Sequence, residues 1–157
     1  MVFANILVPY DRSSASKRAL AKAVALANED SAAKLTVLNI AKVPDFNSQE
    51  FRMFAEASGG RSLSEGKIQQ IVERYIEQEK MDLEQDMKDI VSEAKVPVSL
   101  DLMQGESIIG TVVKHSQDIG ADLIVMGSRG LGALRGVLGS VSYGVLRSVE
   151  IPVLIVK

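Results

Sequence analysis

The chain has 157 residues, the size of one domain, and at this length roughly 70% of the unfolded surface can be buried in a core. Its composition is 46% apolar, 24% charged and 4% aromatic, which indicates a globular protein with an aliphatic core. A formal net charge of −2 gives no indication of a strong electrostatic attraction to nucleic acid or to an anionic membrane. The absence of cysteine excludes disulfides, zinc–thiolate sites and cysteine nucleophiles.

The first residues, MVFANILVPYD, reach an apolar run and then Asp11 without a basic region or a long apolar stretch. This pattern is not that of a signal peptide. No apolar run in the sequence approaches the roughly 18 residues that a membrane span needs. Together with the lack of cysteine, these features lead us to expect a cytoplasmic protein of one domain, residues 1–157.

The first half of the chain predicts two strands around a helix, followed by a loop. Residues 5–10 (NILVPY) and 34–40 (KLTVLNI) are short apolar runs typical of strands. Between them, residues 15–28 form an alanine-rich helix that Ser13 or Ser14 can cap. Residues 41–65 carry no sustained period, so we expect a loop with at most one helical turn around residues 51–55.

The middle of the chain predicts a long helix and an edge strand. Apolar residues recur at helical spacing over residues 66–94, and we interpret the acidic run at residues 77–89 as the solvated face of this helix. In residues 96–102 (VPVSLDL) apolar and polar side chains alternate, which predicts one wet face. Because Pro97 cannot donate to a strand ladder, we expect this strand at an edge of the sheet.

The last third predicts two more helices and two more strands. A helix follows QGES, with Ile108, Ile109, Val112, Val113 and Ile119 expected on its buried face. Residues 122–126 (DLIVM) read as a strand buried on both faces. A glycine-rich stretch, a helix over residues 140–148 and a final strand, PVLIVK, complete the chain.

Strands and helices alternate throughout, which predicts an α/β fold in three layers, a doubly wound open parallel sheet of five strands. With strand three at one edge and the last strand at the other, the expected order is 3-2-1-4-5. The last strand, with Val153, Leu154, Ile155 and Val156, is apolar on both faces, and an exposed apolar edge invites pairing. We therefore expect a homodimer through this strand, the alternative being an edge covered by a helix or loop of the same chain.

The stretch from Met126 to Ser142, MGSRGLGALRGVLGSVS, follows the buried fourth strand. In open parallel sheets ligands bind outside the carboxyl ends of the strands, where the strand order reverses, here between strands one and four. Gly139 and Ser140 would open the next helix, whose backbone amides can bind an anion, and Arg129 can add a charged contact. No Lys precedes Ser140, so this is not a Walker A loop. A glycine-rich connector without a ligand is the alternative.

The order of ILVPYDRS, LTVLNI, GES, ADLIVMGSRGLG, LGSVS and PVLIVK along the whole chain resembles the universal stress protein (UspA-like) family. Nucleotide-binding members of that family carry glycine, two residues, glycine, nine residues, glycine, and then Ser or Thr. Here eight residues separate Gly130 from Gly139, and we expect Gly132 and Gly136 to let the loop absorb the difference. The resemblance implies a Rossmann-like, adenine nucleotide alpha hydrolase-like fold, dimerisation through the last strand, and ATP binding.

Carried over by position, the resemblance implies a set of nucleotide-binding residues. Asp11 would contact the ribose and adenine region, Pro9 and Tyr10 would line the same wall, and Ile40 would lie next to adenine. Gly105 would leave room for the ligand. The ribose and phosphates would lie along one segment, with Met126, Gly127, Arg129, Gly130, Gly139, Ser140, Val141 and Ser142.

Catalytic groups are harder to find in the sequence. We expect the only histidine, His115, to be a solvated surface residue, which leaves a nucleophilic triad poorly supported. No cluster has the spacing of a metal site, although one Mg²⁺ or Mn²⁺ could arrive with the phosphates. The leading interpretation is an adenine nucleotide-binding stress-response or signalling module with slow or absent hydrolysis. The alternatives are a nucleotide hydrolase or phosphotransferase, and a dimeric interaction module without nucleotide.

Overall fold

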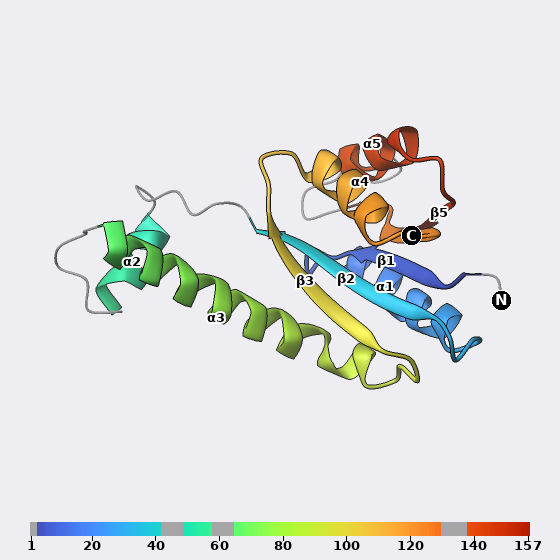
Figure 1. Ribbon diagram of the computed structural model, residues 1–157, viewed down its shortest axis with the longest axis horizontal. Coiled ribbons are helices and arrows are strands. Elements are labelled where there is room, and N and C mark those ends of the chain that lie inside the picture. The colour runs from blue at the N-terminus through green and yellow to red at the C-terminus, as the bar shows by residue number, and fades with distance from the viewer. Residues whose placement is uncertain (1–2, 42–48, 58–64, 130–137) are drawn as a thin grey trace.

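The protein is built on a sheet of five parallel strands in the order β3-β2-β1-β4-β5, with helices on both faces (Figure 1). The computed structural model describes residues 3–41, 49–57, 65–129 and 138–157. The elements in chain order are β1 (Asn5–Pro9), α1 (Ser14–Ala27), β2 (Lys34–Ala41), α2 (Gln49–Ala57), α3 (Glu65–Val91), β3 (Val98–Gln104), α4 (Ile108–Asp118), β4 (Leu123–Gly127), α5 (Ser140–Ser148) and β5 (Val153–Val156). The predicted α/β class and strand order are confirmed.

β1 lies at the centre of the sheet and divides the core in two. Ile6 is paired with Leu35 of β2 on one side and with Leu123 of β4 on the other. Successive side chains of a strand point to opposite faces, so Ile6 and Leu7 enter different clusters. The Ile6 cluster is covered by α1 and α3, and the Leu7 cluster is covered by α4 and α5. These two clusters give the three layers.

α1 begins at a cap that the sequence predicts. The hydroxyl of Ser13 accepts a hydrogen bond from the amide of Ser16 at 3.1 Å, which satisfies one of the free donors of the first turn. The buried face of the helix is mostly alanine, with Ala15, Ala19, Ala23 and Ala27 among its members. These short side chains let the helix axis approach the sheet closely.

The segment between β2 and α3 differs from the prediction. We expected a loop with one turn near residues 51–55, but Gln49–Ala57 form a helix of nine residues, α2. A helix this short offers too few turns for a period to be read from sequence. The ring of Phe54 meets the ring of Tyr75 edge-on, with centroids 5.5 Å apart, which packs α2 against α3.

α3 is much longer than the strands it covers. Its 27 residues span about 40 Å at 1.5 Å per residue, whereas the seven residues of β3 span about 23 Å. The first half of α3 therefore extends past the carboxyl ends of the strands, and α2 packs against this projecting half (Figure 1). Within the described ranges, no helix is long and apolar enough to cross a membrane.

The edge strand and α4 follow the prediction with two shifts. β3 starts at Val98, after Pro97, and the hydroxyl of Ser99 on its wet face donates to Thr36 Oγ1 at 3.3 Å. Ile108, which we expected to be buried, is exposed, because it is the first residue of α4 and lies off the side that faces the sheet. Val112 on the same helix is fully buried, as expected.

Candidate functional site

The strand order reverses between β1 and β4, where β1 turns to β2 on one side and to β4 on the other. The carboxyl end of β1 leads into Tyr10 and Asp11, and the carboxyl end of β4 is Gly127. Parallel pairing of Leu7 with Ile124 brings these two ends to the same edge of the sheet. The predicted switch point therefore carries both of the segments expected there.

Two hydrogen bonds hold the start of α5 against the end of β4. The amide of Gly139 donates to the carbonyl of Ser128 at 2.7 Å, and the hydroxyl of Ser142 donates to the carbonyl of Gly127 at 2.7 Å. A Cβ on Gly139 would lie 3.2 Å from the Ser128 oxygen, so the close approach favours glycine. Gly130, Gly132 and Gly136 lie outside the described residues.

The first turn of α5 presents backbone amides at this edge. Gly139 is the N-cap, and no side chain of the described ranges bonds to the amides behind it. Helix geometry leaves the amides of Ser140, Val141 and Ser142 without partners inside the helix. Aligned amides and the positive end of the helix dipole favour an anion. Ser140 is exposed, whereas Ser142 is buried and its hydroxyl already bonds to the carbonyl of Gly127.

Gly127 and the buried Met126 belong to the strand that positions this turn. A Cβ on Gly127 would lie 2.7 Å from the Cβ and 2.8 Å from the carbonyl carbon of Ala15, in the first turn of α1. Only glycine lets α1 lie this close to the end of β4. Arg129, two residues further on, is partly exposed.

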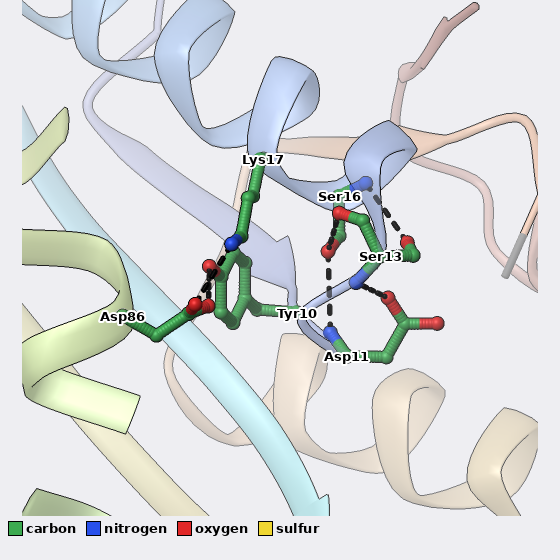
Figure 2. Close-up of polar contacts among 6 residues, drawn as sticks. All are labelled: Tyr10, Asp11, Ser13, Ser16, Lys17 and Asp86. Carbon is green, nitrogen blue, oxygen red and sulfur yellow. Dashed lines mark hydrogen bonds and ion pairs between the residues drawn. The ribbon is translucent and has the colours of Figure 1, made fainter. Parts of the chain in front are cut away.

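Asp11 is exposed at the end of β1, in the turn that leads to α1. Its Oδ1 accepts from the amide of Ser13 at 3.0 Å, and its own amide donates to Ser16 Oγ at 3.4 Å. Arg12, the next residue, has φ of 66°, a conformation that is uncommon without glycine. Figure 2 shows the carboxylate of Asp11 on the side of Ser13, pointing away from α3 and Asp86.

The side chain of Tyr10 takes the opposite direction. We expected it to line the ligand wall, but it is only 3% exposed and packs in the core under α1 and α3. Its hydroxyl donates to Asp86 Oδ2 at 2.5 Å, and Lys17 Nζ donates to Asp86 Oδ1 at 2.7 Å (Figure 2). Alternation along the strand sends Pro9 to the other face, with Leu7.

These contacts set the charge states of Tyr10 and Asp86. Burial, the hydrogen bond to Asp86 and the negative charge of Asp86 all raise the pKa of Tyr10 above its ordinary value. Burial alone would raise the pKa of Asp86, but the hydrogen bonds from Lys17 and Tyr10 outweigh it and hold that pKa below its ordinary value. Asp86 is therefore an ionised acceptor and Tyr10 a neutral donor at neutral pH.

Two further candidates lie near β2 and β3. Ile40 is partly buried and packs against the cluster under α4 and α5. Gly105 was expected to leave room for a ligand, but a Cβ there would overlap Thr111 Oγ1. Packing against the Thr111 side chain of α4 therefore already favours glycine at this position.

His115 is not the solvated residue that we expected. Its side chain is 11% exposed, and Nε2 lies 2.8 Å from Asp101 Oδ2 on β3. His115 also borders a groove of about 230 Å³ beside α4. The groove is lined by Met103, Gln104, Ser107, Gly110, Thr111, Lys114 and His115. Among the described residues, no group of three His, Cys, Asp or Glu side chains is placed to hold a metal.

Comparison with known proteins decides the family. The model of the universal stress protein family matches residues 3–157. The chain belongs to the universal stress protein family. A search of curated proteins found no match.

Solved universal stress proteins share the fold over the whole chain. Universal stress protein UspA from Lactobacillus plantarum has a TM-score of 0.73 and 19% identity, over 100% of this chain and 99% of that one. A universal stress protein in complex with cAMP has a TM-score of 0.65 and 23% identity, over 100% and 99%. The universal stress protein from Archaeoglobus fulgidus in complex with dAMP has a TM-score of 0.60 and 21% identity, over 100% of each chain.

In this universal stress protein, the candidate residues separate into two groups. Asp11, Gly127, Arg129, Gly139 and the first turn of α5 lie at the ends of β1 and β4 or just beyond them. The side chain of Tyr10 and the glycine requirement at position 105 are instead accounted for by packing within the chain.

Sequence reasoning missed Asp86 as a partner of the β1–α1 turn. The available signal was a pair of acidic residues, Glu79 and Asp86, flanking the buried Leu83 on one side of α3.

Proposed function

We propose that this universal stress protein binds an adenine nucleotide, with ATP as the first candidate, and acts as a stress-response or signalling module. The observation that carries the proposal is the first turn of α5, which presents uncapped amides at the switch point. The Gly139–Ser128 and Ser142–Gly127 hydrogen bonds hold this turn in place. Phosphates would bind these amides, and Asp11 would accept hydrogen bonds from the ribose hydroxyls.

Two relatives support the choice of ligand class. The universal stress proteins crystallised with cAMP and with dAMP both hold an adenine nucleotide, and their chains match this one over its full length. Pro9, Ile40, Met126, Gly130 and the backbone of Tyr10 complete the proposed site. A divalent ion, Mg²⁺ or Mn²⁺, would accompany ATP through its phosphates.

The sharpest test of the site places a negative charge at the start of α5. Ser140→Glu should abolish ATP binding, because the carboxylate occupies the anion position, while the helix keeps its stability since acidic residues favour helix N-termini. Ser31→Glu adds the same charge at an exposed turn near the amino end of β2 and should bind ATP normally. Binding would be measured by calorimetry, and nucleotide copurified with the wild type by chromatography after denaturation. Equal affinity in both variants would move the site elsewhere.

Slow or absent hydrolysis stays a prediction, as does the cytoplasmic location. Incubation of the protein with ATP and Mg²⁺ separates the binding module from a hydrolase or phosphotransferase. Turnover that disappears in Asp11→Ala and persists in Ser31→Glu would favour the enzyme. If the purified protein contains no nucleotide and its Tm does not change with ATP, the results would favour a dimeric interaction module that binds no nucleotide.

We also infer that β5 forms the interface of a homodimer. One side of β5 pairs with β4, through Ile124 and Val153 among others, and Leu154 is a large exposed apolar residue. Pairing with a second copy would satisfy the other edge and bury Leu154. Leu154→Lys should give a monomer by light scattering after gel filtration, and Leu146→Lys on the exposed side of α5 should not. A monomeric wild type would contradict the inference.

A further inference from the structure

The turn that carries Asp11 is attached to α3 by two carboxylates. Asp86 accepts hydrogen bonds from Tyr10 and Lys17, at 2.5 and 2.7 Å. Glu79 Oε2 accepts from Arg12 Nη2 at 3.2 Å. Glu79 and Asp86 are seven residues apart, so both lie on the same side of the helix, two turns from each other.

The two attached residues flank Asp11 in the sequence. Tyr10 precedes it and Arg12 follows it, and both side chains bond to carboxylates of α3. Figure 2 shows Tyr10 directed toward Asp86, while the carboxylate of Asp11 points away from α3. Arg12 also has a positive φ, which persists only where the surroundings hold the backbone. The contacts of Tyr10 and Arg12 with α3 therefore hold the backbone on both sides of Asp11, whose own Oδ1 and amide bond to Ser13 and Ser16.

Asp86 is the stronger of the two anchors. Asp86 accepts two charge-assisted hydrogen bonds. The bond from Tyr10 is shielded because that side chain lies in the core, whereas the Lys17 side chain is 40% exposed. The Arg12–Glu79 pair is a single, longer and partly exposed contact without a buried partner, so it contributes less.

We propose that Asp86, through Tyr10 and Lys17, is a positioning residue for the nucleotide site and couples α3 to Asp11. This rests on the proposed function, but Asp86 lies on α3, outside the glycine segment and every strand end. Coupling between two sites is reciprocal, so nucleotide bound at Asp11 would in turn hold α3 against the sheet. The end of α3 that carries α2 would then sense whether nucleotide is bound.

The experiment separates positioning from stability with a double variant. Asp86→Ala leaves the buried hydroxyl of Tyr10 without a partner, so both stability and ATP affinity should fall. Adding Tyr10→Phe removes that hydroxyl and should restore most of the stability. A positioning role predicts that ATP affinity stays about tenfold weaker in this double variant, the loss expected for one charge-assisted hydrogen bond. Recovery of affinity together with stability would overturn the proposal.

A second measurement does not depend on nucleotide. In the ligand-free protein, amide exchange at residues 11–16 should be faster in the double variant than in the wild type. Asp118→Ala is the matched control, because Asp118 also accepts from a lysine at 2.7 Å, but on the exposed side of α4. Unchanged exchange in the double variant overturns the proposal even if ATP binds. A wild type that binds no ATP overturns the proposed function, and the exchange data still decide whether Asp86 fixes the Asp11 turn.

Discussion

Gly127→Ala tests the contact that brings α1 to the end of β4. The new methyl would lie 2.7 Å from the Cβ, 2.8 Å from the carbonyl carbon and 3.0 Å from the oxygen of Ala15. Two of these atoms belong to the backbone of a helix, so no side-chain rotation relieves the overlap and α1 must move. Overpacking of this kind costs about 1–3 kcal/mol. At about 2–4 °C per kcal/mol for a chain of this size, Tm should fall by about 2–12 °C.

The assay is thermal and denaturant unfolding followed by circular dichroism, with two further variants. Gly66→Ala in α3 is the control, since a Cβ there meets nothing within 4 Å and alanine favours a helix, so stability should be unchanged or higher. Ala15→Gly in the Gly127→Ala background removes the Cβ contact but leaves the backbone contacts, so the double variant should stay destabilised. Wild-type stability of Gly127→Ala, or full rescue by Ala15→Gly, would refute the reasoning.

Three further variants probe the core, the charge of Asp86 and the start of α5. Leu83→Ala empties a fully buried position between α3 and the sheet and should lower the free energy of unfolding by about 2–5 kcal/mol in a urea titration, whereas a loss below about 1 kcal/mol would contradict the burial. The folded-state pKa of Asp86 is lowered, so its ionised form stabilises the fold above about pH 4, and this contribution is lost as the pH falls through the folded pKa. The deficit of Asp86→Asn in the free energy of unfolding should therefore be full at neutral pH and shrink in acid; a deficit independent of pH would count against an ionised Asp86. Ser142→Ala leaves the carbonyl of Gly127 without its 2.7 Å donor and should cost about 1–3 kcal/mol by the same urea titration, with an unaffected midpoint arguing that water replaces the hydroxyl.

The strand order could be predicted because a strand buried on both faces is apolar throughout, whereas a strand with one exposed face alternates apolar and polar residues. The run at residues 122–126 is apolar throughout, and β4 lies inside the sheet with every residue buried. Residues 96–102 alternate and contain Pro97, and β3 lies at the edge. With β3 and β5 at the two edges, the strand order reverses between β1 and β4, and the glycine stretch follows β4 directly. Each step used residues close together in sequence.

The side-chain contacts could not be predicted, because they join residues far apart. Tyr10 and Asp86 are 76 positions from each other, and a tyrosine at the end of a strand reads equally well as core or as ligand wall. His115 lies off the apolar face of α4, and the sequence does not reveal that Asp101 shields it. These partners depend on how α3 and α4 cross the sheet, which hydropathy does not specify.

The start of α5 is held by contacts with β4, independently of the length of the glycine stretch. Eight residues separate Gly130 from Gly139, one fewer than in the family motif. A shorter loop would displace the helix if the loop alone decided where the helix begins. Here the Gly139 amide bonds to Ser128 and the Ser142 hydroxyl bonds to Gly127, so contacts with β4 fix the start of α5 directly. Because these contacts hold the start of the helix, the missing residue should leave the amides at Ser140 in place.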